Sequence, residues 1–71
     1  MNMGQRHNLL SPETAEAVRR GMRALHIQGP VRAVWADEHY RVIELVHCQQ
    51  VDTIKLIGPT ARIFMEAFRG T

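Results

Sequence analysis

The chain has 71 residues, of which 45% are hydrophobic and 23% are charged, and its formal net charge is +2. This length allows one small domain, and the composition excludes a disordered polar chain, a collagen-like repeat and a membrane-spanning helix. The single cysteine, Cys48, excludes an internal disulfide, so we expect a protein of the reducing cytoplasm.

The first segment, residues 1–9, is mostly polar and shows no periodicity. We therefore expect it to form a flexible N-terminal arm. The remaining residues, 10–71, carry continuous hydrophobic patterning, and we expect them to form a single α+β domain.

A first helix is predicted to begin at Ser11-Pro12, because a Ser side chain caps free N–H groups and Pro is tolerated in the first helical turn. Gly29-Pro30 predicts that this helix ends near residue 27. Its apolar residues recur at three- and four-residue steps, which predicts an amphipathic helix. These residues are Ala15, Val18, Met22 and Leu25.

Three segments rich in β-branched and aromatic residues are predicted to be strands. These segments are residues 31–36, 40–48 and 51–57. The polar pair Asp37-Glu38 separates the first two segments and Gln49-Gln50 separates the last two. Both pairs predict tight turns, so the strands should form an antiparallel meander.

A second helix is predicted after the last strand, because Gly58-Pro59 breaks the chain and apolar residues then return at helical spacing up to Gly70. Thr60 is expected to cap its N-terminus. The element order is therefore α-β-β-β-α. We predict an α+β fold with a three-stranded antiparallel meander and two helices packed on one face of it.

Alternation along the predicted strands sorts their side chains onto two faces. The face that we expect the helices to cover carries Val34, Ile43, Leu45, Ile54 and Leu56. The opposite face carries the only Trp and the only Tyr of the chain among small apolar residues: Val31, Ala33, Trp35, Tyr40, Val42 and Val46. Glu44 and Lys55 interrupt this second face, as predicted cross-strand neighbours.

The second face suggests what the protein does. A domain of this size buries only roughly 60% of its unfolded surface, and an open face that bears Trp35 and Tyr40 is more apolar than solvent usually permits. We therefore expect a small non-catalytic, regulatory or inhibitory protein-interaction module that forms a homodimer or binds another protein through this face. In the alternative interpretation, Trp35 belongs to the monomer core and no partner is needed.

Nucleic-acid binding is a second candidate function, because the α-β-β-β-α order is similar to that of double-stranded-RNA-binding domains. Trp35 and Tyr40 would then serve as stacking platforms. The possible nucleic-acid contacts are Arg19, Arg20, Arg23 and Arg62. The junction from Gly58 to Arg62 offers free N–H groups to an anion, but it lacks a phosphate-loop pattern, so we interpret it as a turn and a helix start.

No catalytic or metal site is predicted. His47 and Cys48 are neighbours on a strand, so they point to opposite faces and cannot act as a nucleophile-base pair. We interpret Cys48 as a small buried residue, and we expect His47 to form a structural hydrogen bond with Asp52. The four histidines lack an i,i+4 pair and the chain has no CxxC motif, so we predict no metal, no cofactor and no enzymatic activity.

Overall fold

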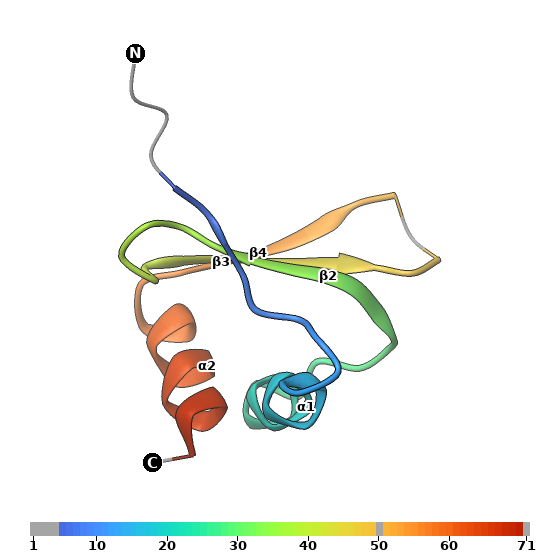
Figure 1. The fold of residues 1–71 in the computed structure, drawn as a ribbon, viewed down its shortest axis with the longest axis horizontal. Helices are drawn as coiled ribbons and strands as arrows, with labels where there is room; N and C mark the ends of the chain where they lie inside the picture. Colours follow the sequence, from blue (N-terminus) through green and yellow to red (C-terminus); the bar gives the residue numbers. More distant parts are fainter. Residues whose placement is uncertain (1–4, 50, 71) are drawn as a thin grey trace.

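The computed structural model describes residues 5–49 and 51–70. They form two layers, with an antiparallel sheet on one side and two helices on the other (Figure 1). The sheet has four strands in the order β1-β2-β3-β4. The elements are β1 (His7–Asn8), α1 (Ala15–Ala24), β2 (Val31–Ala36), β3 (Val42–His47), β4 (Thr53–Ile57) and α2 (Pro59–Arg69). The predicted α+β class is confirmed.

The first strand, β1, lies in the segment that we assigned to a flexible arm. His7 pairs with Ala36, and the Leu9 N–H donates to the Val34 carbonyl at 2.8 Å. The Leu9 side chain is buried in the core. The sheet therefore has four strands instead of the predicted three, because a two-residue strand leaves no periodic signal in the sequence. Residues 1–4 of the predicted arm lie outside the described residues.

The helix α1 begins later than predicted. Ser11 closes a turn that precedes the helix, where its N–H donates to Thr14 Oγ1 at 2.9 Å. The Thr14 hydroxyl in turn donates to the Leu9 carbonyl, and the Val18 N–H donates to the Thr14 carbonyl at 2.9 Å. Thr14 is therefore the residue at the N-cap, and its side chain ties the helix start to the end of β1.

The helix α2 begins directly after Gly58, as the Gly58-Pro59 break predicts. Gly58 has φ 60° and ψ −133°, a conformation that residues with a Cβ rarely adopt. Thr60 does not cap the helix as predicted, because its hydroxyl donates to the Ile57 carbonyl at 2.8 Å. The predicted end of the helix at Gly70 is confirmed, with a left-handed φ of 81°.

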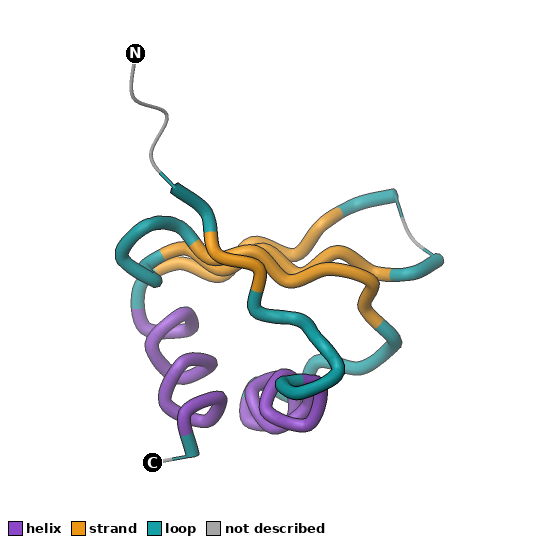
Figure 2. Tube along the Cα trace, viewed as in Figure 1, coloured by secondary structure: helices purple, strands orange, loops and turns teal. Residues whose placement is uncertain are grey.

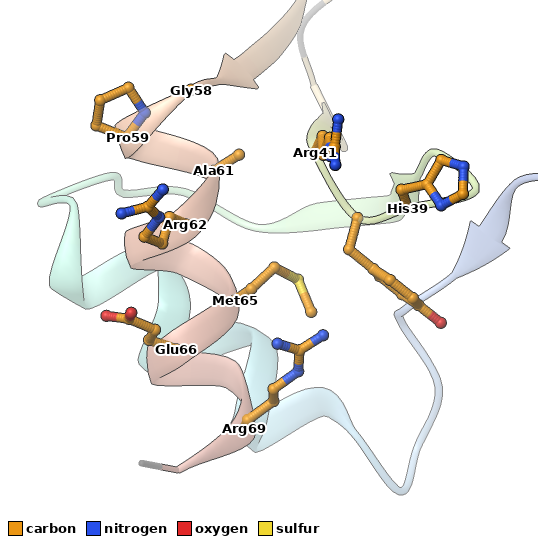
Figure 3. Close-up of a pocket in the computed structure, with 10 residues that line it drawn as sticks. His39, Arg41, Gly58, Pro59, Ala61, Arg62, Met65, Glu66 and Arg69 are labelled. Carbon is orange, nitrogen blue, oxygen red and sulfur yellow. The ribbon is translucent and has the colours of Figure 1, made fainter.

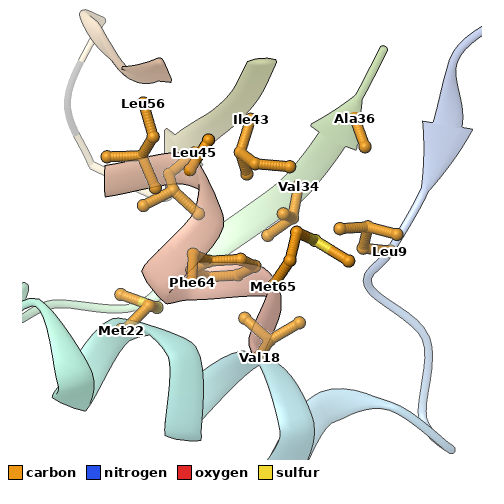
Figure 4. Packing of buried hydrophobic residues seen from close by; sticks show 11 residues of the cluster. Leu9, Val18, Met22, Val34, Ala36, Ile43, Leu45, Leu56, Phe64 and Met65 are labelled. Carbon is orange, nitrogen blue, oxygen red and sulfur yellow. The ribbon is translucent and has the colours of Figure 1, made fainter. Parts of the chain in front are cut away.

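The core lies between the two layers. On the sheet side it is formed by the face that we predicted the helices to cover, which we call the inner face. Figure 4 shows the Phe64 ring of α2 between the sheet residues and α1. Fully buried side chains come from both layers: Val18, Val34, Ile43, Leu45 and Phe64. Leu56 is also buried, and Ile54 is half-buried against the same cluster. The prediction that the helices cover this face is confirmed.

The register is as predicted between β3 and β4, where Glu44 lies opposite Lys55. Between β2 and β3 the turn is longer than the predicted Asp37-Glu38 pair, and Trp35 lies opposite Glu44. Tyr40 belongs to the turn between these strands, with φ 59°. A β-bulge between Val31 and Ala33 sets Val31 opposite the buried His47. Val31 therefore packs against the core, and the predicted placement of Val31 and Tyr40 on the second face is wrong.

At Gly21, α1 packs directly against the Phe64 ring of α2. A Cβ on this residue would lie 2.6 Å from the Cδ2 and Cε2 atoms of Phe64. The Phe64 ring is fully buried, so it has no space into which it can move. Only glycine at residue 21 therefore permits this helix packing.

We predict that Gly21→Ala destabilises the protein by about 1–2 kcal/mol, because the cost of overpacking exceeds the gain in helix propensity. The measurement is the free energy of unfolding in urea. Phe64→Leu removes the ring edge, so the double variant should lose less stability than the two single variants added together. A Gly21→Ala protein that is more stable than the wild type would contradict this packing.

Candidate functional site

One face of the sheet has no helix over it. Both helices lie on the same side of the sheet (Figure 2), and none of the described elements covers the other side. We call this side the outer face. By strand alternation it carries Ala33, Trp35, Val42, Glu44, Val46, Thr53, Lys55 and Ile57. Four of the six residues of the predicted interaction surface therefore lie on it.

A row of charged side chains crosses the outer face. Glu44 lies at its centre, with the Arg6 guanidinium 3.8 Å away on one side and the Lys55 ammonium 3.9 Å away on the other. The Arg6 guanidinium also lies over the Trp35 ring, 4.5 Å from the ring centroid. Trp35 is half-buried as a result. The sequence pattern did not indicate this contact, because Arg6 belongs to the segment that we assigned to the arm.

The outer face ends at an exposed isoleucine on the edge strand β4. The residue is Ile57, which is 59% exposed and lies opposite Val42. Ile57 was missing from the predicted interaction surface, although the alternation that places Lys55 on this face also places Ile57 there. Together with Val46 at the other end of β3, these residues put apolar groups on both sides of the charged row.

Tyr40 and Val31 do not join the outer face. The Tyr40 ring stacks on the His7 ring with centroids 4.5 Å apart, and the Arg69 guanidinium lies 5.6 Å from the Tyr40 centroid. Tyr40 therefore packs on the helical side of the sheet. Its left-handed backbone in the turn causes this placement, since a residue continuing the strand would alternate with its neighbours.

The arginines of α1 form contacts within the chain. Arg23 and Arg19 hold the two carboxylate oxygens of Glu16 at 3.1 and 3.0 Å, and these bonds lower the pKa of the Glu16 carboxyl. Arg20 donates to the carbonyls of Ala67 at 3.1 Å and Phe68 at 2.9 Å, at the C-terminal end of α2. The Ala67 carbonyl also accepts a hydrogen bond from the Gly70 N–H at 3.2 Å, and Arg20 adds charge-assisted donors at this negative end of the helix.

Arg62, the fourth possible nucleic-acid contact, is not near these arginines. It lies on α2 and lines a cleft between this helix and the β2–β3 turn (Figure 3). The turn contributes His39, Tyr40 and Arg41 to the cleft. Sequence reasoning missed the cleft, because its two walls come from segments about twenty residues apart, and their packing sets it rather than any local motif.

The cleft depends on the shape of the β2–β3 turn, which Asp37 holds. The Asp37 carboxylate accepts hydrogen bonds from the backbone N–H of Val42, at 2.8 Å, and of Arg41. These bonds, led by that of Val42, lower the pKa of the Asp37 carboxyl. The ionised form therefore stabilises the turn that presents Tyr40 and Arg41.

His47, Cys48 and Asp52 do not form a site. His47 is buried, and its Nε2 lies 3.3 Å from the Gln28 carbonyl. Asp52 is exposed, and the predicted hydrogen bond between it and His47 is not formed. Cys48 is exposed, so its predicted burial is wrong. Within residues 5–49 and 51–70, no three His, Cys, Asp or Glu side chains are grouped as a metal site would require.

No family model, no curated protein and no solved structure matches this chain. Neither helix in the described part of the chain has the length and apolar character needed to cross a membrane.

We predict that Arg20→Ala costs about 1.5–3 kcal/mol of stability, because it removes two charge-assisted hydrogen bonds to the end of α2. The matched control is Arg19→Ala, which removes one exposed ion pair and should change stability by less than about 0.5 kcal/mol. Urea unfolding of the two variants makes the comparison. Equal losses would show that the Arg20 contacts contribute nothing beyond surface charge.

We predict that Asp37→Asn lowers the stability of the protein at pH 7. Because folding lowers the pKa of the Asp37 carboxyl, the wild type has its full advantage above the unfolded pKa of about 4 and loses it as the pH falls through the folded value. The difference in unfolding free energy between the two proteins should therefore shrink below about pH 4. A difference that is constant from pH 7 to pH 2 would exclude a role for the charge.

Proposed function

We propose that the protein is a non-catalytic interaction module that forms a homodimer through its outer face. The observation that carries this proposal is the outer face of β3 and β4, where Val42, Ile57 and Val46 flank the Glu44–Lys55 pair and none of the described helices covers them. A second copy would also provide the burial that a small domain lacks on its own.

The outer face is complementary to itself. Along β3 and β4, three pairs of outer residues lie opposite each other: Val42 with Ile57, Glu44 with Lys55, and Val46 with Thr53. In the proposed dimer, the two-fold axis is parallel to the strands and passes over the outer face, midway between β3 and β4. It places β3 of the second copy over β4 of the first, and each residue keeps its position along the strand direction. Val42 then faces Ile57 of the second copy, and Glu44 faces Lys55 of the second copy, each twice.

This arrangement explains why a copy of the same chain suits the face better than a partner of uniform charge. Glu44 already contacts Arg6 and Lys55 in its own chain, so the face carries both signs in one row. An acidic or a basic partner would place a like charge against one member of the row. The two-fold arrangement places opposite charges together, with apolar contacts on both sides of them.

Trp35 would lie at the margin of the two-fold contact. It is on β2, one strand away from β3, so the same axis carries it beyond β4 of the other copy. The indole would then cover the free edge of that strand, which has no neighbour among the described strands. The dimer would thus protect an open sheet edge as well as an apolar face.

The nucleic-acid alternative has less support from α1. Arg20 is engaged with the end of α2, and Arg19 and Arg23 share Glu16. A steeply salt-dependent affinity for duplex RNA that Arg19→Ala weakens would favour it. The single, exposed Cys48 is consistent with our proposal that the module works in the reducing cytoplasm.

Two exposed isoleucines provide a matched test of the dimer. Ile57 lies on the outer face and Ile63 lies on α2, and they are 59% and 42% exposed. We predict that Ile57→Lys weakens dimerisation by at least about tenfold, because it places a charge in an apolar contact. Ile63→Lys adds the same charge on the helical layer and should leave the dimerisation constant unchanged. Sedimentation velocity over a range of concentrations measures both.

Two results would refute the proposed dimer. One is a wild-type mass equal to a single chain at all micromolar concentrations. The other is an Ile63→Lys protein that loses association while Ile57→Lys retains it, since this would place the contact on the helices.

A further inference from the structure

The cleft between the β2–β3 turn and α2 carries an excess of positive charge. Its volume is about 730 Å³, which is in the range of small-molecule sites. Three of its lining residues are Arg41, Arg62 and Arg69, and the only acidic one is Glu66. Three positive charges and one negative charge give the lining a formal charge of +2, equal to that of the whole chain.

The cations come from both walls of the cleft. Arg41 follows Tyr40 in the turn, whereas Arg62 and Arg69 belong to α2. In Figure 3, the Arg69 side chain extends from α2 into the space between the helix and the turn, beside Met65. His39 lies at the far rim and points away from the helix. Guanidinium groups on two sides of one space can hold one anion between them.

The start of α2 adds backbone donors to the same wall. Gly58, Pro59 and Ala61 line the cleft, and the Arg62 N–H is the first to bond within the helix, to the Gly58 carbonyl at 3.1 Å. The N–H groups of Thr60 and Ala61 precede this bond and have no acceptor in the helix. They lie at the opposite end of α2 from Arg69, so they are donors at one end of the cleft and do not contact an anion that Arg69 holds.

The cleft also has apolar surface beside these cations. Met65, Ala61 and Pro59 line it together with the Tyr40 side chain. Such a mixture suits a ligand that has an organic part as well as a charged group. A phosphate monoester carries a charge of about −1.5 to −2 at pH 7, which matches the charge of the lining more closely than a single carboxylate does.

We propose that this cleft binds a small organic phosphate monoester of about the size of a nucleotide. The phosphate lies between Arg41 and Arg69, and the organic part contacts Met65 and Tyr40. This site is on the helical side of the molecule, whereas the proposed dimer uses the outer face. A negative result for one proposal would therefore not contradict the other.

The test uses AMP as the ligand and the full chain as the protein, with binding followed by amide chemical shifts in NMR. We expect saturable shifts at Tyr40, Arg41 and Met65, and none with adenosine, which lacks the phosphate. Arg41→Gln and Arg69→Gln should each raise the dissociation constant of AMP by at least about tenfold. Arg32→Gln is the matched control, because Arg32 is exposed on β2 and does not line the cleft; it should change the constant by less than about twofold.

Several outcomes would overturn the proposal. These are the absence of saturable shifts up to about 10 mM AMP, equal binding of adenosine, and an equal loss in Arg32→Gln. Shifts centred on Arg19 and Arg23 would place the anion on α1 instead. A single-stranded oligonucleotide that binds the same residues far more tightly than AMP would identify a nucleic-acid strand as the occupant in place of a small ligand.

Discussion

The contact between Gly21 and the Phe64 ring determines how the rest of the molecule is arranged. It brings α1 and α2 together so closely that a single methyl group would not fit. Arg20, the residue before Gly21, then reaches the carbonyls at the end of α2. The two helices therefore form one layer, and this layer covers one face of the sheet only.

This one-sided arrangement has a consequence for the whole surface. Both helices pack on the inner face, so none of the described helices covers Trp35 and its apolar neighbours on the outer face. Arg6 covers part of the indole, which lowers its exposure but adds no second layer. A domain with a single buried face has a small stability margin, so the proposed association through the outer face would also stabilise the fold.

The sequence predicted the faces of β3 and β4 correctly, because their alternation is regular, and Glu44 lies opposite Lys55 as predicted. The prediction of the faces was wrong where the backbone does not alternate as a regular strand does. These places are the bulge after Val31 and Tyr40, which has a left-handed backbone conformation. The cleft was missed for a different reason: it exists only because α2 packs beside the β2–β3 turn, and no local pattern encodes that contact.

The short strand β1 connects the two surfaces. Its alternation sends Arg6 to the outer face, over Trp35, and sends His7 to the helical side, onto Tyr40. Tyr40 in turn lines the cleft and lies beneath Arg69. Two consecutive residues therefore contact both proposed binding surfaces, and two ladder pairs plus the Leu9 hydrogen bond to Val34 hold them in place. Displacing β1 would therefore alter both surfaces together.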